Sequence, residues 1–522
     1  KPNEAPPAEP PEPTAPAAPQ SLESRLETVQ SAKAAWALAQ EASAAKQPEP
    51  AFAAAEIAVG LDRNFAPAYL FMGQQLAAQG SYEEAYLCFS EAARVGQIPP
   101  QAEQMLRAMD DNPELQTDSI QTYRNCVSAD SYNPTEQPRR ILVFTNLLPP
   151  QEMGGFGRSV WELCEGLIQR GHELCILTAD VKELEQTPYP NYQRVERRVE
   201  RTLQLFGKWE NGVAVEMTDP DKIREIAIGN VETILKAVQR FRPDVCMAGN
   251  LDFVSGAMLE PILAKKIPII HRLGNEIPGY PVETLPRSEL FCLAGCSHWV
   301  NSQLQQAGYH AAHFACLPPG SPLHEYYRLM PPRTDRLRIC YAGLMMGYKG
   351  PHLILEALHL LKQLKIPFTC EFAGDFKGEK YKAQFGQMIR QWDLGQQVRV
   401  LGFCNRQELG AMYARSNVLV LPSIFEEPFG KVQIEAQAAG LAVVRTPVGG
   451  YQDMLEDEVN GLLFKRKDPQ DLARQLYVLN ERRDFWQRLA ARGQADAFRF
   501  TTRNSVQILE GLFEELLKLT AD

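Results

Sequence analysis

The segment of this sequence with the clearest chemical content places two glutamates, Glu427 and Glu435, eight positions apart. Glu427 stands just before a Pro-Phe-Gly turn, and Glu435 lies in the helix that this turn is expected to open. The first amides of a helix have no intrahelical acceptor, so those of Phe429, Gly430 and Lys431 would bind a diphosphate or the polar edge of a sugar. From these positions, Glu427 would accept hydrogen bonds from sugar hydroxyls and Glu435 from ribose hydroxyls.

Two further candidate positions follow apolar runs. Gly154, Gly155 and Gly157 form a glycine-rich loop. Without side chains, the backbone amides of this loop could approach a diphosphate or an acceptor, although a turn of no chemical consequence explains so short a pattern about as well. His271 closes the apolar run 267–270. A lone histidine after a strand is more often structural than catalytic.

Short apolar runs of the buried parallel-strand type alternate with helical segments from residue 139 onward. They lie at 141–144, 174–177, 245–248 and 267–271 in a first series, and at 339–342, 368–373, 398–401, 418–421 and 442–445 in a second. Each series predicts a doubly wound parallel sheet. We therefore expect an α/β fold with two Rossmann-like domains, 139–320 and 333–500. A C-terminal helix within 501–522 would cross back to the first of them.

Residues 21–130 have a helical pattern rich in alanine. A shift of 34 residues aligns Ala51 with Ala85 and Ala58 with Ala92, and this shift equals the tetratricopeptide period. We predict a small all-α domain of about two tetratricopeptide-like repeats, with a plain helical bundle as the alternative. Such repeats bind peptides or mediate assembly, and they also serve as packing extensions.

Composition excludes several classes of protein. A formal net charge of −10 argues against a nucleic acid partner, because phosphate backbones require a concentrated basic face. The arginines between Arg194 and Arg201 alternate with glutamates, so a solvated helix face is favoured over an acceptor or membrane site. Eleven cysteines without a CxxC pair indicate reduced, buried thiols.

The ends and the hydropathy of the chain give two more expectations. A Pro/Ala-rich linker is expected over residues 1–20, which would make the chain a fragment of a longer polypeptide. The sequence has no apolar stretch of membrane-spanning length and no signal segment. It therefore predicts a cytoplasmic location with at most peripheral membrane contact.

The segment from Glu427 to Glu435 resembles the Glu-x7-Glu signature of the retaining family 4 glycosyltransferases, which have the GT-B fold. The sequence that follows also resembles this family, at Gly440, Val444, Gly449, Gly450 and Asn460 to Leu463. The similarity extends over residues 139–500. It implies that the first Rossmann-like domain binds an acceptor and that the second binds a nucleotide-sugar donor, UDP- or GDP-linked.

The implied reaction is transfer of a sugar to an acceptor hydroxyl with retention at the anomeric carbon. No cofactor and no obligatory metal is implied. The acceptor would be a glycan, a lipid-linked molecule or a protein, and the helical repeats would offer a surface to a protein partner.

The resemblance also implies roles for individual residues. The catalytic set is His271, Glu427 and Lys349. The donor-binding set is Gly154, Gly155, Gly157, Gly343, Lys349, Asp375, Phe403, Pro428, Phe429, Gly430, Lys431 and Glu435. The family carries an arginine where this chain has Leu344, so one positive charge beside the diphosphate is missing. Lys431 is a candidate substitute for that charge.

Two other functions fit parts of the pattern. One is a phosphorylase or another GT-B enzyme that uses phosphate rather than a nucleotide donor, although no feature of the sequence favours it. The other is a scaffold whose repeats recruit a partner while the transferase domain is degenerate, as Leu344 would indicate. The presence of Glu427, Glu435, Lys349 and His271 favours an active transferase over a scaffold.

Overall fold

The computed structural model describes residues 31–110, 132–151, 155–184, 192–210, 213–329 and 332–520, together with isolated residues between 22 and 29 and between 112 and 127. Gly154 and the predicted linker over residues 1–20 lie outside the described residues. The chain divides into two compact units, Lys1–Met109 and Asp110–Asp522.

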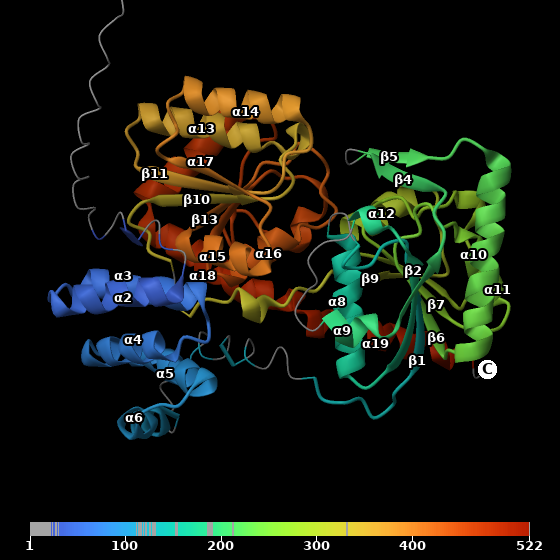
Figure 1. Ribbon diagram of the computed structural model, residues 1–522, viewed down its shortest axis with the longest axis horizontal. Helices are drawn as coiled ribbons and strands as arrows, with labels where there is room; N and C mark the ends of the chain where they lie inside the picture. Colours follow the sequence, from blue (N-terminus) through green and yellow to red (C-terminus); the bar gives the residue numbers. More distant parts are fainter. Residues whose placement is uncertain are drawn as a thin grey trace, which may run out of the picture. The chain divides into compact units, whose positions relative to one another are not determined.

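The first unit is helical (Figure 1). Its helices are α2 (Ala32–Ala44), α3 (Pro48–Leu61), α4 (Ala66–Ala78), α5 (Tyr82–Val95) and α6 (Pro100–Asp110), of which α2 packs on α3 and α4 on α5. A Cβ atom at Gly73 would lie 2.8 Å from the Phe89 ring, so the glycine lets α4 and α5 approach closely. The helical character predicted for this region is confirmed, and the tetratricopeptide assignment stays a prediction.

The second unit begins with a seven-stranded parallel sheet in the order β3-β2-β1-β6-β7-β8-β9. Its strands are β1 (Arg140–Phe144), β2 (Glu173–Ala179), β3 (Val199–Leu203), β6 (Val245–Ala248), β7 (Ile269–Leu273), β8 (Phe291–Gly295) and β9 (His313–Cys316). The central strands β6, β7 and β8 are buried along their whole length, as expected for parallel strands covered on both faces. Strand order reverses at β1, between β2 and β6, and such reversals open a ligand crevice at the carboxyl ends of the strands.

Helices cover both faces of this first sheet, α10 and α11 one face and α8 and α19 the other (Figure 1). Their bounds are α8 (Phe156–Gln169), α9 (Tyr192–Glu196), α10 (Pro220–Phe241), α11 (Leu259–Leu263), α12 (His298–Gln306) and α19 (Thr502–Lys518). A short antiparallel hairpin, β4 (Gly207–Glu210) and β5 (Val213–Glu216), precedes α10. The C-terminal helix α19 packs on α8, where Glu510 pairs with Arg170 at 2.9 Å.

A second parallel sheet has six strands in the order β12-β11-β10-β13-β14-β15. Its strands are β10 (Leu337–Ala342), β11 (Phe368–Ala373), β12 (Val398–Gly402), β13 (Val418–Leu421), β14 (Ala442–Arg445) and β15 (Leu462–Leu463). Here the order reverses at β10, between β11 and β13. Each sheet therefore has its own reversal point, and the two lie in equivalent places.

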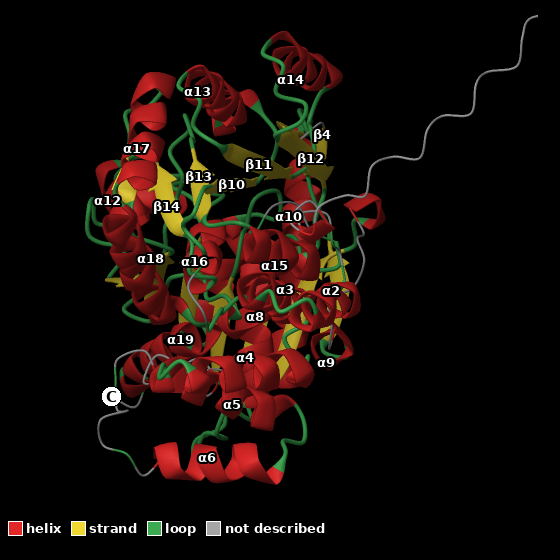
Figure 2. Cartoon of the chain, turned by 90° about the vertical axis from the view of Figure 1, so that its left-hand side faces the viewer, coloured by secondary structure: helices red, strands yellow, loops and turns green. Residues whose placement is uncertain are grey.

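Figure 2 shows the strands of the second sheet between two helical layers. The helices are α13 (Pro351–Gln363), α14 (Glu379–Gln391), α15 (Arg406–Arg415), α16 (Lys431–Ala438), α17 (Pro469–Glu481) and α18 (Arg483–Ala497). Among them, α13, α14 and α17 cover one face, and α15 and α16 cover the other. Gly350 opens α13 with φ +72°, where a Cβ atom would lie 2.2 Å from the Pro422 carbonyl oxygen.

The predicted α/β class with two Rossmann-like domains, preceded by a helical region, is therefore confirmed. Within the described residues, every helix is too short or too polar to span a bilayer.

Candidate active site

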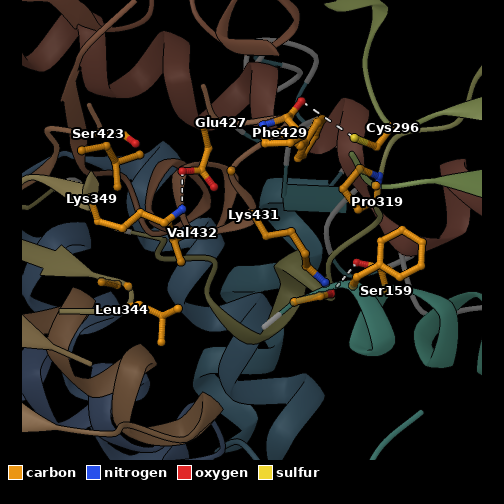
Figure 3. Close-up of a pocket in the computed structure, with 18 of the residues that line it drawn as sticks. Ser159, Cys296, Pro319, Leu344, Lys349, Ser423, Glu427, Phe429, Lys431 and Val432 are labelled. Carbon is orange, nitrogen blue, oxygen red and sulfur yellow. Dashed lines mark hydrogen bonds and ion pairs between the residues drawn. The ribbon is translucent and has the colours of Figure 1, made fainter. Parts of the chain in front are cut away.

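A cavity of about 340 Å³ is lined by both Rossmann-like domains (Figure 3). The first domain contributes the start of α8 and residues at the ends of β7 and β8. The second contributes the loop after β10, the segment after β13 and the start of α16. Both sheets thus present the carboxyl ends of their strands to one shared space, which is where open α/β sheets bind ligands.

Lys349 and Glu427 face each other in this cavity (Figure 3). Lys349 Nζ lies 2.5 Å from Glu427 Oε2, and both side chains are partly exposed. The Tyr348 and Phe425 rings flank the ammonium, with centroids 5.8 Å and 5.6 Å from Nζ. The two residues predicted as catalytic in the second domain therefore form one charged pair at the site.

Backbone contacts hold Glu427 in place. Its carbonyl oxygen accepts a hydrogen bond of 2.9 Å from the Gly450 amide. Gly449 has φ +61°, and a Cβ atom there would lie 2.0 Å from the same carbonyl oxygen, so the close approach requires glycine. The neighbouring Glu426 has a structural role. Its carboxylate accepts hydrogen bonds from the Gly449 amide at 2.6 Å and from Arg466 at 2.9 Å. One glutamate fixes the loop while the next lines the cavity.

The start of α16 lines the cavity, with Pro428, Phe429, Gly430 and Lys431 all at its wall. Gly430 has φ +118° and caps the helix. The Pro428 carbonyl accepts a 2.7 Å hydrogen bond from Ser297 of the first domain. This bond ties the turn to the opposite side of the cavity.

Lys431 is neutralised by the first domain. Its side chain is 13% exposed, and its ammonium pairs with Glu162 of α8. The Glu162 carboxylate also accepts a hydrogen bond of 2.9 Å from Arg406 of α15. Arg406 in turn pairs with Glu325 at 3.0 Å. Burial lowers the pKa of Lys431, and the Glu162 charge opposes that effect. The lysine considered as a substitute for the missing cation at Leu344 is thus already bound to a carboxylate.

Two buried arginines at the wall were missed by sequence reasoning. Arg272 follows His271 in β7, and Arg445 ends β14; both are about 1% exposed. Arg445 is fully engaged, since it donates to Gln433 at 2.5 Å and to the carbonyl oxygens of Thr446 and Val448. Its burial lowers its pKa to about 10. Their positions in the sequence could have identified them as candidate site residues, because both arginines stand at the carboxyl ends of predicted strands, where open α/β sheets bind ligands.

His271 is fully buried and does not line the cavity. Its Nδ1 lies 2.8 Å from the Tyr280 hydroxyl, and its Nε2 has no hydrogen-bond partner. Burial lowers the pKa of this imidazole to about 3, so the ring is neutral at physiological pH. The alternation of side chains along a strand turns its neighbour Arg272, rather than His271, toward the cavity.

The remaining predicted donor-binding residues divide into two groups. Gly155 and Gly343 line the cavity, as does Leu344. Gly157, Asp375, Phe403 and Glu435 do not line it. Among these four, the Glu435 carboxylate is 5% exposed and accepts from Ser321 at 2.9 Å, while the Asp375 carboxylate accepts from the Phe403 amide at 3.0 Å. Their assignment to ribose and base remains a prediction.

A possible metal-ligand group lies elsewhere. Among the described residues, His298, Cys316 and Asp453 place one ligand atom each within 4.8 Å of one another. None of the three lines the cavity, and His298 Nδ1 is already 3.2 Å from Asp453 Oδ1.

The match to a known family lies in the second Rossmann-like domain, and curated proteins are similar to parts of the chain. Residues 330–496 match the family model of glycosyl transferases group 1. An uncharacterized glycosyltransferase of Methanocaldococcus jannaschii is 30% identical over 27% of this chain and 35% of its own length. A D-inositol 3-phosphate glycosyltransferase of Corynebacterium urealyticum is 28% identical over 40% of this chain and 54% of its own. The chain thus spans between a third and about half of these relatives.

Longer but weaker similarities cover both Rossmann-like domains. The glycogen synthase of Mycobacterium tuberculosis is 24% identical over 64% of this chain and 83% of its own length. A glycosyltransferase structure from Rickettsia africae superposes with a TM-score of 0.58 at 17% identity, over 73% of this chain and 99% of that one. Anabaena Alr3699/HepE in complex with UDP gives 0.56 at 18% identity, over 72% and 100%.

These similarities agree with the observed fold and with the resemblance to glycosyltransferases that the sequence showed. The arrangement of two Rossmann-like domains is that of the GT-B fold. The resemblance to glycosyltransferases is confirmed at the level of the group 1 model for residues 330–496.

Proposed function

We propose that this protein is a glycosyltransferase that moves a sugar from a nucleoside diphosphate donor to an acceptor hydroxyl with retention at the anomeric carbon. The observation that supports it most directly is the Lys349–Glu427 pair, 2.5 Å apart in the cavity shared by the two domains. The match of residues 330–496 to glycosyl transferases group 1 supports the same activity. The scaffold alternative is not favoured, because the cavity retains both charged groups.

The chemical difficulty in this reaction is the negative charge that develops on the departing diphosphate. Lys349 and the first amides of α16, which begins at Lys431, line the cavity and would stabilise that charge. Such fixed donors need no reorganisation during the reaction, and this is usually the largest contribution to catalysis. We propose that the reaction needs no obligatory metal or cofactor, because these groups would stabilise the leaving diphosphate.

Glu427 would orient the transferred sugar. In this structure its carboxylate is paired with Lys349. A bound donor would bring phosphate oxygens to the ammonium and hydroxyl groups to the carboxylate, so each charge would exchange one partner for another. Because the two groups are already in contact, the donor replaces an existing ion pair rather than binding to two separately solvated charges.

His271 would act from behind the cavity wall. Its neutral ring is fixed by the Tyr280 hydroxyl, and its burial keeps it neutral across the physiological range. We assign it a role near the transferred sugar through the resemblance stated above. Closure of the two domains over the donor would exclude water and limit hydrolysis.

The donor is proposed to be UDP- or GDP-linked, and the acceptor to be a glycan, a lipid-linked molecule or a protein. The relatives named above support a hydroxyl-bearing acceptor. Thermal shift measurements with UDP-, GDP- and ADP-sugars test the proposal first, since a degenerate scaffold would respond to none of them. Proton NMR of the product, with and without EDTA, then tests anomeric retention and independence from metal.

A further inference from the structure

Among the described residues, Arg272 is a buried cation without an ion-pair partner. It ends in the wall of the cavity, is 1% exposed, and its Nε and Nη1 atoms have no hydrogen-bond acceptor. The guanidinium carbon lies 4.8 Å from the centroid of the Phe156 ring. Glu162 is the carboxylate whose charge acts on it, but that carboxylate is already shared by Arg406 and Lys431. Burial without a partner lowers the pKa of Arg272.

Such an arrangement is unfavourable in the protein alone. A buried charge is normally paired and hydrogen-bonded, and an uncompensated one destabilises the fold. The other three cationic residues that line the cavity are satisfied: Lys349 by Glu427, Lys431 by Glu162 and Arg445 by Gln433. Among the four described cationic side chains that line the cavity, Arg272 is the one without an acceptor at its Nε and Nη1 donors.

The surroundings of Arg272 hold it at this position. Phe156, on which the guanidinium stacks, is the first residue of α8. A Cβ atom at Gly274 would lie 1.9 Å from the Phe156 ring, so this glycine makes room for the ring. Gly155, which precedes the helix, also lines the cavity. The first amides of a 14-residue helix and a planar guanidinium thus border the same space, and both prefer oxyanions.

We propose that Arg272 binds phosphate oxygens of a ligand in this cavity, with the start of α8. This inference rests on the proposed function and deepens it. Arg272 supplies, from the first domain, the positive charge that the loop after β10 lacks at Leu344. Phosphate oxygens could belong to the donor diphosphate or to a phosphorylated acceptor, and the variants below distinguish these two sources.

The test uses the full chain and two substitutions. Arg272→Met keeps most of the side-chain volume and removes the charge, whereas Arg272→Lys keeps the charge. Arg287→Met is the matched control, because Arg287 is exposed and does not line the cavity. Calorimetry measures the affinity for UDP, GDP, ADP and inorganic phosphate, and a thermal scan measures the melting temperature of each variant.

We expect Arg272→Met to weaken the binding of phosphate-bearing ligands by about 10- to 100-fold, as for the loss of a charge-assisted hydrogen bond. Arg272→Lys should restore part of the affinity, and the control should match the wild type. The melting temperature without ligand should not fall in Arg272→Met and is expected to rise, because an unpaired buried charge has been removed. A residue with a merely structural role would give a lower melting temperature.

The pattern of affinities identifies the source of the phosphate. Weaker binding of the nucleoside diphosphates assigns Arg272 to the donor. Unchanged nucleoside diphosphate binding with weaker inorganic phosphate binding assigns it to a phosphorylated acceptor. Wild-type affinity of Arg272→Met for all four ligands overturns the proposal, as does a fall in its melting temperature that Arg272→Lys prevents. If the wild-type protein binds inorganic phosphate but no nucleoside diphosphate, the proposed function fails. The affinity of Arg272→Met for inorganic phosphate then still tests the role of Arg272.

Discussion

Lys349 Nζ and Glu427 Oε2 lie 2.5 Å apart although 78 positions of sequence separate the two residues. One follows β10 and the other follows β13, and these strands are neighbours in the second sheet. The loops that follow adjacent parallel strands leave the same edge of the sheet, and where the strand order reverses they border one crevice. The pair is thus a direct product of sheet order, and it supplies both charges that the proposed chemistry needs in the second domain.

Removing the carboxylate should abolish transfer without unfolding the protein. Glu427→Gln keeps the size and the backbone contacts of the residue, including the hydrogen bond from Gly450. We expect a fall in turnover of about 100-fold or more, typical of losing a group that acts in the transition state. Product formation measured by chromatography tests this. Glu379→Gln, at an exposed glutamate, is the control, and unchanged turnover in Glu427→Gln would remove Glu427 from the mechanism.

Removing the ammonium should weaken nucleotide binding. Lys349→Met is expected to lower the affinity for nucleoside diphosphates by about 10-fold or more, because a charge-assisted hydrogen bond to phosphate is lost. Calorimetry with UDP and GDP measures the effect, and Lys382→Met, at an exposed lysine, controls for net charge. Equal affinity in the two variants would contradict the role given to Lys349.

The carboxylate of Glu162 should be essential for stability. It is 5% exposed and holds Arg406 and Lys431 of the second domain. Breaking a buried ion pair from one side leaves uncompensated charge and costs about 3–5 kcal/mol. Glu162→Gln should therefore lower the melting temperature by several degrees. Glu165→Gln, one turn further along α8, provides the comparison, and an equal or larger fall there would refute this account of the cluster.

The pH dependence of stability should carry a contribution from Glu165. Burial raises its pKa from the ordinary 4.5 to about 7, although Arg194 lies 3.6 Å away. Between these two values the folded protein holds a proton that the unfolded chain has lost, so stability falls as pH rises from about 4.5 through 7. Glu165→Gln cannot lose this proton. We expect equal melting temperatures of variant and wild type near pH 4.5 and a more stable variant at pH 8. If the melting temperatures of variant and wild type differ by the same amount at every pH in this range, Glu165 makes no such contribution to the pH dependence of stability.

Deleting residues 1–109 should leave nucleotide binding intact. Every residue that lines the cavity belongs to the second compact unit, which begins at Asp110. A chain that starts at residue 110 is therefore expected to bind nucleoside diphosphates within about threefold of the full chain, well inside the tenfold that corresponds to 1.4 kcal/mol. Calorimetry on both chains tests this, with circular dichroism to verify folding. Loss of binding by a folded remainder would make the helical region part of the active unit.

Much of the fold could be predicted from the sequence, because buried parallel strands produce continuous apolar runs. The runs at 141–144 and 339–342, for example, became β1 and β10, the strands at which both sheets reverse. Helix and turn chemistry was readable too. The Pro-Phe-Gly segment predicted a helix start at the cavity, and Gly430 adopts φ +118° there.

The site was less predictable, because neither burial nor ion pairing follows from a motif. Glu435 fits the sequence pattern as well as Glu427 does, yet its carboxylate is buried beside Ser321 rather than at the cavity wall. Arg272 has no motif of its own and is adjacent to a histidine that the pattern favoured. Which of two neighbours on a strand reaches a cavity depends on what packs on each face of the sheet.

The order of residue types along this chain determined its two parallel sheets, its helical region and the turn that places Glu427, because these depend on local conformation and on alternating hydrophobic segments. Only the tertiary structure decided which cations are satisfied. Glu162 reaches Lys431 across 269 positions, whereas Nε and Nη1 of Arg272 have no acceptor among the described residues. Electrostatic partners are set by distances of a few ångströms between side chains, and those distances exist only after the two domains have packed.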